Sequence, residues 1–159
     1  MLKEKSTDAA KAMKYALWLL GRRNHSEKEI RQKLGRNYEA AAVEAVIEKL
    51  KSQKFIDDEK FAGEWAEYRL GQKKSRNFVL SELARKGISR ETAQGVLSGM
   101  SVDERKSAYD LLARRMKQYE KLEPQKKRSR IFRFLASRGF GPDVIEDVSR
   151  ELLRKDENE

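Results

Sequence analysis

Apolar side chains recur along this chain at intervals of three and four residues, the spacing that gathers them on one face of an α-helix. Ala9, Ala12, Ala16 and Leu20 show this pattern and predict a helix over residues 9–21. Eight further segments repeat it, over residues 26–34, 39–50, 57–68, 78–86, 89–97, 103–116, 124–138 and 142–152. No segment alternates between apolar and polar residues as a half-buried strand does. The pattern therefore predicts an all-α protein.

Residues that begin and end helices stand between these segments. Residues 26–29 (Ser-Glu-Lys-Glu) and 101–104 (Ser-Val-Asp-Glu) fit the capping box, in which a serine hydroxyl and a glutamate carboxylate each accept a free backbone N–H. Ser89 is expected to cap another helix. Gly87 and Gly139 follow the ends of two segments, where glycine readily takes the left-handed conformation.

The nine expected helices fall into three groups of three, and the second and third helices of the groups align. Leu34, Leu83 and Leu135 each lie near the end of a second helix, 49 and 52 residues apart. Each is followed by an Asn or Gly, which tolerate a positive φ, and then by an apolar residue. These turns are Asn37-Tyr38, Gly87-Ile88 and Gly139-Phe140, and Val46, Val96 and Val148 match in the third helices.

The repeat predicts three tandem three-helix modules that stack in an elongated arrangement, because one such unit buries little alone. The expected bounds are 1–52 with an N-terminal extension, 53–100, and 101–159 with an acidic C-terminal tail. Coincidence among leucine-rich helices is the alternative interpretation.

Composition narrows the function. The 159 residues include no Cys and one His, which excludes disulfides, thiolate metal sites and a multi-histidine metal site. No apolar run is long enough to span a membrane, and no secretory signal is recognisable, so a cytoplasmic protein is expected. The sequence contains 36 Lys and Arg against 26 Asp and Glu, a net charge of +10. An acidic partner such as nucleic acid is the first candidate.

The positive charge follows the repeat. Residues 22–36 carry a net charge of +4, residues 69–86 carry +5 and residues 126–138 carry +6, so these stretches total +15 and the rest of the chain totals −5. Three basic patches on one side of the protein would suit the phosphates of a long polymer. The alternative is that these cations form a solvated face or oppose helix dipoles. The candidate binding residues are Arg76, Arg85, Lys86, Lys127, Arg128, Arg130, Arg133 and Arg138.

Other candidate sites have simpler explanations. Residues 57–59 (Asp-Asp-Glu) lack the spaced ligands of a cation loop, so Asp57 or Asp58 is expected to cap a helix. His25 has no recognisable nucleophile or orienting acid, and we expect it to be solvated or packed in a turn. For Trp18 and Trp65, core or module-interface packing is favoured over stacking on nucleic-acid bases. Helix-turn-helix reading of DNA is a weak alternative, since no helix carries a clear base-reading set. Neither a cofactor nor an enzymatic activity is expected.

Four ordered blocks carry a resemblance to a known family. Residues 55–62 (Phe-Ile-Asp-Asp-Glu-Lys-Phe-Ala) resemble the Asp-Asp signature of the RecX family, regulators of the bacterial RecA recombinase. Residues 22–30 with Leu34, residues 82–88 and residues 133–140 are similar to its other blocks, and the resemblance covers about residues 12–153. Ser75 departs from the pattern, because the family often has Gly there.

The resemblance implies three modules in a curved, elongated protein. It implies a non-enzymatic regulator in DNA repair and homologous recombination, which lodges in the groove of the filament of RecA-type recombinase on single-stranded DNA. There it would inhibit ATP hydrolysis, strand exchange and coprotease activity. The expected partners are this filament and single-stranded DNA, with double-stranded DNA as a further candidate beside them, and the expected state is a monomer. Two rival hypotheses are an autonomous nucleic-acid-binding protein and a protein–protein adaptor.

Overall fold

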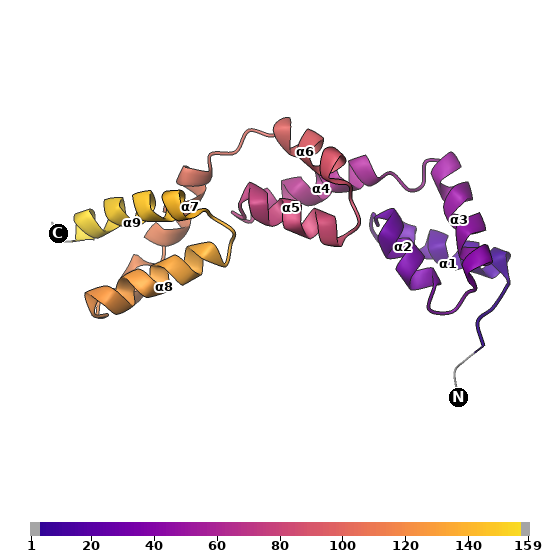
Figure 1. Cartoon of the computed structure of the whole chain (residues 1–159), viewed down its shortest axis with the longest axis horizontal. Helices are drawn as coiled ribbons and strands as arrows, with labels where there is room; N and C mark the ends of the chain where they lie inside the picture. Colours follow the sequence, from indigo (N-terminus) through magenta and orange to yellow (C-terminus); the bar gives the residue numbers. More distant parts are fainter. Residues whose placement is uncertain (1–3, 157–159) are drawn as a thin grey trace. The chain divides into compact units, whose positions relative to one another are not determined.

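A computed structural model describes residues 4–156 and confirms the all-α class (Figure 1). Within this range the regular structure consists of nine α-helices, one short 3-10 turn and a single bridge between Ser6 and Tyr38. The helices are α1 (Ala9–Arg22), α2 (Glu27–Leu34), α3 (Ala40–Ser52), α4 (Asp58–Gly71), α5 (Arg76–Arg85), α6 (Arg90–Ser98), α7 (Glu104–Ala113), α8 (Pro124–Ala136) and α9 (Pro142–Asp156), with the 3-10 turn η1 (Met116–Gln118) after α7.

The expected starts of most helices are confirmed, and one is wrong. Ser26 caps α2 by accepting the Glu29 N–H at 3.2 Å, and Ser89 accepts the Thr92 N–H at 3.1 Å. The capping box at Ser101 does not form. Asp103 caps α7 instead, because its carboxylate reaches the Lys106 N–H at 2.9 Å. The same helix ends at Ala113, three residues before Met116, which lies in η1.

The three repeated turns are not identical. Gly87 and Gly139 have φ values of 83° and 85°, as the sequence predicts. Asn37 is not among the described residues with a positive φ, so that part of the prediction is wrong. A different contact stabilises this turn: Ser6 donates its N–H to the Asn37 carbonyl at 2.9 Å and accepts the Glu39 N–H at 3.0 Å. The segment before α1 therefore pairs with the turn after α2.

Two compact units make up the chain, Met1–Trp65 with Leu83–Val96, and Ala66–Glu82 with Leu97–Glu159. The core of the first unit joins α1, α2 and α3 through buried residues that include Ala16, Ile30, Leu34, Ile47 and Leu50. The core of the second unit joins α7, α8 and α9 through buried residues that include Leu112, Ile131, Leu135, Ile145 and Val148. The border between the units runs through α4, α5 and α6. The expected module bounds 1–52, 53–100 and 101–159 stay a prediction.

The repeated leucines occupy equivalent positions in the fold. Leu34, Leu83 and Leu135 are all completely buried at the ends of α2, α5 and α8. The matching valines of the third helices are less uniform, since Val46 and Val148 are buried and Val96 is half-buried. Across residues 4–156, no helix combines the length and apolarity required to cross a bilayer. The expected acidic tail falls partly on residues 157–159, outside the described range.

Candidate functional site

The start of α2 is joined to the end of α5 by a buried serine. The Ser26 side chain is completely buried, and its hydroxyl donates to the Lys86 carbonyl at 2.7 Å while it caps its own helix. The neighbouring Lys28 donates its ammonium to the Arg85 carbonyl at 3.0 Å. Both contacts satisfy carbonyl groups at the end of α5 that the helix itself leaves without partners.

The start of α5 is joined to the end of α8 in the same way. Ser75 is also completely buried, and its hydroxyl donates to the Gly139 carbonyl at 2.6 Å and accepts the Phe78 N–H at 3.1 Å. Its backbone N–H donates to the Arg138 carbonyl at 3.1 Å. Ser26 and Ser75 are 49 residues apart, the spacing of Leu34 and Leu83. We call these two contacts the serine junctions.

The serine junctions explain why glycine follows α5 and α8. A Cβ atom on Gly87 would lie 2.6 Å from the Cβ of Lys28. A Cβ atom on Gly139 would lie 2.5 Å from the Ser75 hydroxyl and 2.6 Å from the Cβ of Phe78. Each glycine is therefore needed both for its positive φ and for the close approach of an earlier helix, α2 at Gly87 and α5 at Gly139.

Lys86 is held inside its unit. Its ammonium lies 2.7 Å from the Glu29 carboxylate and 4.0 Å from the centre of the Trp65 ring. Burial acts to raise the pKa of Glu29, but hydrogen bonds from Arg23 and Lys86 outweigh it and lower that pKa overall. Because this pair is only about one-fifth exposed, it stabilises the contact of α2 with the end of α5 more than it offers charge to a partner.

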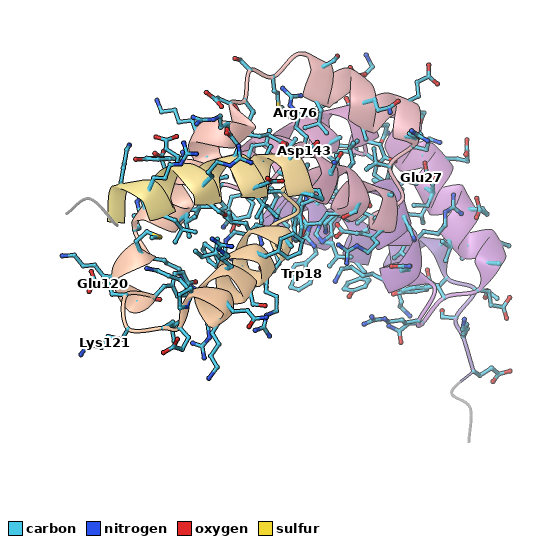
Figure 2. All side chains as sticks on the ribbon, turned by 60° about the vertical axis from the view of Figure 1, so that its left-hand side comes forward. Trp18, Glu27, Arg76, Glu120, Lys121 and Asp143 are labelled. Atoms are coloured by element: carbon cyan, nitrogen blue, oxygen red, sulfur yellow. The ribbon has the colours of Figure 1, made fainter. Side chains whose placement is uncertain are left out.

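Arg76 also serves the fold. Its guanidinium donates to the Leu97 carbonyl at 2.5 Å and to the Met100 carbonyl, at the end of α6 (Figure 2). Its backbone N–H donates to the Glu104 carboxylate at 2.6 Å, at the start of α7. Arg76 therefore joins the start of α5 to the end of α6 and the start of α7 within its unit, and both terminal guanidinium nitrogens have protein acceptors.

Arg85 and Arg138, the cations at the ends of α5 and α8, differ in exposure. Arg85 is exposed, and it has an interaction within the protein. Arg138 is half-buried, with its guanidinium carbon 4.1 Å from the centre of the Phe134 ring. Burial, followed by the nearby charge of Arg115, lowers the pKa of Arg138. Of the two side chains, that of Arg85 is the more accessible to a partner.

The basic side chains of α8 are the most accessible of the candidates. Arg128, Arg130 and Arg133 are exposed, whereas Lys127 is half-buried and interacts within the protein. Lys126, Arg130 and Arg133 share one face of the helix because they are four and three residues apart. We call this face the α8 ridge. Within residues 4–156, Lys126 and Arg130 make no ion pair, and α8 itself contains no acidic residue.

Lys126 did not figure among the candidates, although the i, i+4, i+7 spacing with Arg130 and Arg133 was visible in the sequence. Arg128 lies on another side of α8 and lines a groove of about 770 Å³ between α8 and α9. Phe132, Ile145 and Leu153 supply apolar side chains to this groove, and Arg150 and Arg154 add charge.

Arg76 and Arg128 occupy equivalent positions with different outcomes. They are 52 residues apart, as are Leu83 and Leu135. The helix α6 ends at Ser98, so its last carbonyls are within reach of Arg76. The helix α9 continues to Asp156, and its carbonyls near the corresponding position are used within the helix. Arg128 is therefore exposed where Arg76 is engaged.

Asp57 and Asp58 contact the starts of two different helices. The sequence predicted only the cap of the helix that follows them. Asp57 caps α4 by accepting the Lys60 N–H at 2.9 Å, which confirms the capping prediction. Asp58 reaches across to α2 and accepts the Glu27 N–H at 2.9 Å. Burial raises the pKa of Asp58. No group of His, Asp and Glu side chains within the described part of the chain could hold a metal ion.

His25 and the two tryptophans complete the candidate set. His25 is packed in its turn, with 5% of its surface exposed. Trp65 is half-buried and stacks on Phe61, with ring centres 6.1 Å apart, as a packing residue would. The prediction for Trp18 is wrong, because 55% of its surface is exposed on α1. The buried residues of α1, Ala12, Ala16 and Leu19, lie on another face of the helix, so the core does not cover Trp18.

Comparison with known families identifies the repeated helices. The models of the first, second and third three-helix domains of RecX match residues 12–50, 57–97 and 103–148. The chain belongs to the RecX family. Regulatory protein RecX of Chlorobium phaeobacteroides (strain BS1) is 36% identical over 151 residues, which cover 93% of this chain and 97% of that protein. Regulatory protein RecX of Clostridium botulinum (strain Alaska E43 / Type E3) is 30% identical over 147 residues, which cover 90% of this chain and 69% of the relative.

Two solved structures share the fold. The crystal structure of RecX from Lactobacillus salivarius matches with a TM-score of 0.75 at 23% identity, over 91% of this chain and 96% of that one. A crystal structure of regulatory protein RecX matches with a TM-score of 0.78 at 22% identity, over 89% and 71% of the two chains. The three-helix domains of this RecX family member are thus confirmed, and its relatives are named as regulatory proteins.

Proposed function

We propose that this protein is a non-enzymatic inhibitor of a RecA-type recombinase. It binds the filament that the recombinase forms on single-stranded DNA and limits ATP hydrolysis, strand exchange and coprotease activity. Membership of the RecX family supports the recombinase as partner. The α8 ridge is the observation that carries the binding surface, because it gathers exposed cations on a helix without acidic residues. The protein acts in the cytoplasm as a monomer.

The candidate cations divide into three groups under this proposal. Arg128, Arg130 and Arg133 are exposed and provide charge for DNA phosphates or for acidic recombinase surface. Arg76, Lys86 and Arg138 hold helix ends in place and shape the surface on which the others lie. Arg85 and Lys127 have partners within the protein and contribute to the positive field around it.

Steady-state ATP hydrolysis by a recombinase on single-stranded DNA tests the proposal. The wild-type protein should inhibit hydrolysis at substoichiometric ratios to the recombinase. For the triple variant Lys126→Glu, Arg130→Glu, Arg133→Glu, the concentration that gives half-maximal inhibition should be at least roughly tenfold higher, since the variant loses about three phosphate or carboxylate contacts. Helical content, followed by circular dichroism, should be unchanged because these side chains are exposed.

A matched control variant has the same change in net charge, but at positions outside the α8 ridge. Lys60→Glu, Lys117→Glu, Lys121→Glu likewise reverses three exposed positive charges, outside α8. It should inhibit like the wild type. Equal weakening by both triple variants would show that net charge alone acts and would refute the α8 ridge as the site. Inhibition only at protein concentrations that saturate the DNA would favour the autonomous DNA-binding protein, and no inhibition would favour the adaptor.

A further inference from the structure

An exposed tryptophan lies on the outer face of α1, where burial would be expected for so large an apolar side chain. Trp18 exposes 55% of its surface, and the buried residues Ala12, Ala16 and Leu19 lie on another face of the same helix. Leu17, 41% exposed, is the neighbouring large apolar residue. The two do not form the broad apolar patch that marks a protein-docking surface.

Aromatic and basic side chains surround Trp18 along the helix. Lys11, Tyr15, Trp18 and Arg22 are spaced by four, three and four residues, so they form one stripe, with Lys14 beside it. No acidic residue occurs between Ala9 and Arg22. We call these five residues the α1 stripe.

Two side chains contact the indole ring of Trp18 and cover it only in part. Tyr15 stacks on it with ring centres 5.9 Å apart and an angle of 18° between the planes. This offset leaves part of the indole face open. The Arg22 guanidinium carbon lies 5.0 Å from the centre of the Trp18 ring. Arg22 makes no ion pair among residues 4–156, so it can leave the ring at little cost.

Aromatic rings flanked by cations are the means by which proteins bind unpaired nucleic-acid bases. A base can stack on the indole because every base has a π-face, while ammonium and guanidinium groups contact the flanking phosphates. The core of a protein-binding surface is usually depleted in lysine, whereas Lys11 and Lys14 accompany the tryptophan here. The basic surroundings therefore favour nucleic acid as the ligand.

We propose that the α1 stripe binds single-stranded DNA by stacking an unpaired base on Trp18. Arg22 moves from the ring to a phosphate when the base arrives, and Lys14 contacts the phosphate on the other side. The inference deepens the proposed function, from which it takes single-stranded DNA as the ligand. Its residues are different from those of the α8 ridge.

Tryptophan fluorescence tests this site without any recombinase. Trp18 and Trp65 are the two tryptophans of the chain, so Trp65→Phe leaves Trp18 as the only one. The fluorescence emission of Trp18 should be quenched when an oligothymidylate of about 20 nucleotides is added. An abasic oligonucleotide of the same length, which carries the phosphates alone, should quench much less. Trp18→Phe leaves Trp65 as the reporter and should show little change.

Affinity gives an independent measure. Trp18→Ala should weaken binding of the oligothymidylate about fivefold to a hundredfold, the range found when one stacking residue is removed. Phe55→Ala is the matched control, because Phe55 is 53% exposed but lies in a loop outside α1. Its affinity should equal that of the wild type. Circular dichroism checks that both variants are folded.

The outcomes separate this inference from the proposed function. Quenching by the abasic strand equal to that by oligothymidylate, or unchanged affinity in Trp18→Ala, overturns the stacking site whatever the ATPase assay gives. Unchanged DNA affinity with weaker filament inhibition in Trp18→Ala would also overturn it, because Trp18 would then contact the recombinase. Quenching and weakened affinity support the stacking site even if the protein fails to inhibit the recombinase.

Discussion

At the scale of single residues, two glycines show how backbone conformation and packing coincide. Gly87 and Gly139 adopt positive φ values and lie against the starts of α2 and α5, respectively. The φ preference could be predicted from their place after a helix, next to an apolar residue. The close contact could not, because it depends on residues about 60 positions away, Lys28 and Ser75.

We predict that Gly139→Ala lowers the free energy of unfolding by about 2–4 kcal/mol, from left-handed strain and overpacking together. Urea denaturation followed by circular dichroism measures it. Gly63→Ala is the control, since Gly63 lies within α4 and nothing lies within 4 Å of an added Cβ. That variant should be more stable by about 0.5–1 kcal/mol. Equal effects of both substitutions would contradict the close-contact explanation.

His25 is the residue for which pH matters most near neutrality. Its Nδ1 lies 2.9 Å from the Arg23 carbonyl, and because a carbonyl only accepts, Nδ1 carries the proton. Burial, the largest influence, lowers the pKa of His25 below its usual value of 6.5. The folded protein thus prefers the neutral ring more strongly than the unfolded chain does.

We predict that this preference is visible in the melting temperature. The stabilisation is fully present above the unfolded pKa of about 6.5 and is lost as the pH falls through the lowered pKa of the folded state. The wild type should therefore melt at a lower temperature at pH 5.5 than at pH 7.5, and His25→Gln should show a smaller difference. His25 is the single histidine of the chain, which keeps the comparison clean. An unchanged pH dependence in the variant would exclude His25 as its source.

At the scale of elements, the serine junctions couple the start of one second helix to the end of the next. One hydroxyl both caps a helix and satisfies a carbonyl of another helix, so the two contacts form together. The capping role of Ser26 could be predicted from residues 26–29. Its hydrogen bond to the Lys86 carbonyl could not, because the two residues are 60 positions apart and no local sequence pattern connects them. The departure from the family pattern at Ser75 supplies the hydroxyl of the second junction.

We predict that Ser75→Ala lowers the free energy of unfolding by about 2–3 kcal/mol, because it removes a cap and leaves the half-buried Gly139 carbonyl without its donor. Ser89→Ala is the matched control, since Ser89 is exposed and caps α6 without a bond to another helix. It should cost about 1 kcal/mol. Denaturation curves of the two variants and the wild type give the comparison, and losses of equal size would mean that the bond to Gly139 contributes nothing.

At the scale of the whole molecule, the positive charge is divided between folding and surface. The first two basic stretches supply ion pairs within the fold, such as Arg31 with Glu27 at 2.7 Å in the first and Arg69 with Glu82 at 2.6 Å in the second. The third stretch leaves most of its cations exposed on α8. The net charge of +10 is therefore a poor measure of the charge that a polyanion can contact. The first two stretches have fewer accessible cations than their sequence suggests, and the third stretch has most of its cations accessible.

We predict that salt dependence follows this division. The affinity for single-stranded DNA is plotted against salt concentration, both as logarithms, and each phosphate contact adds about 0.7 to the steepness of the slope. Reversal of Lys126, Arg130 and Arg133 removes three such contacts and should make the slope less steep by about 2. Lys86→Gln should leave the slope nearly unchanged and lower the stability instead, since it removes the partner of a half-buried carboxylate. Fluorescence anisotropy at four salt concentrations measures the slopes. A larger change of slope for Lys86→Gln than for the triple variant would refute the division.

The sequence by itself determined the helices, the positions of the repeated leucines and the family. These follow from local periodicity and from ordered motifs, which act over a few residues. Only the tertiary structure decided which cations are available and that Trp18 is exposed. A charged or aromatic side chain has the same local pattern whether it binds a distant carbonyl or faces solvent. The choice depends on what the fold brings to it: the end of α6 reaches Arg76, while the longer α9 leaves Arg128 exposed.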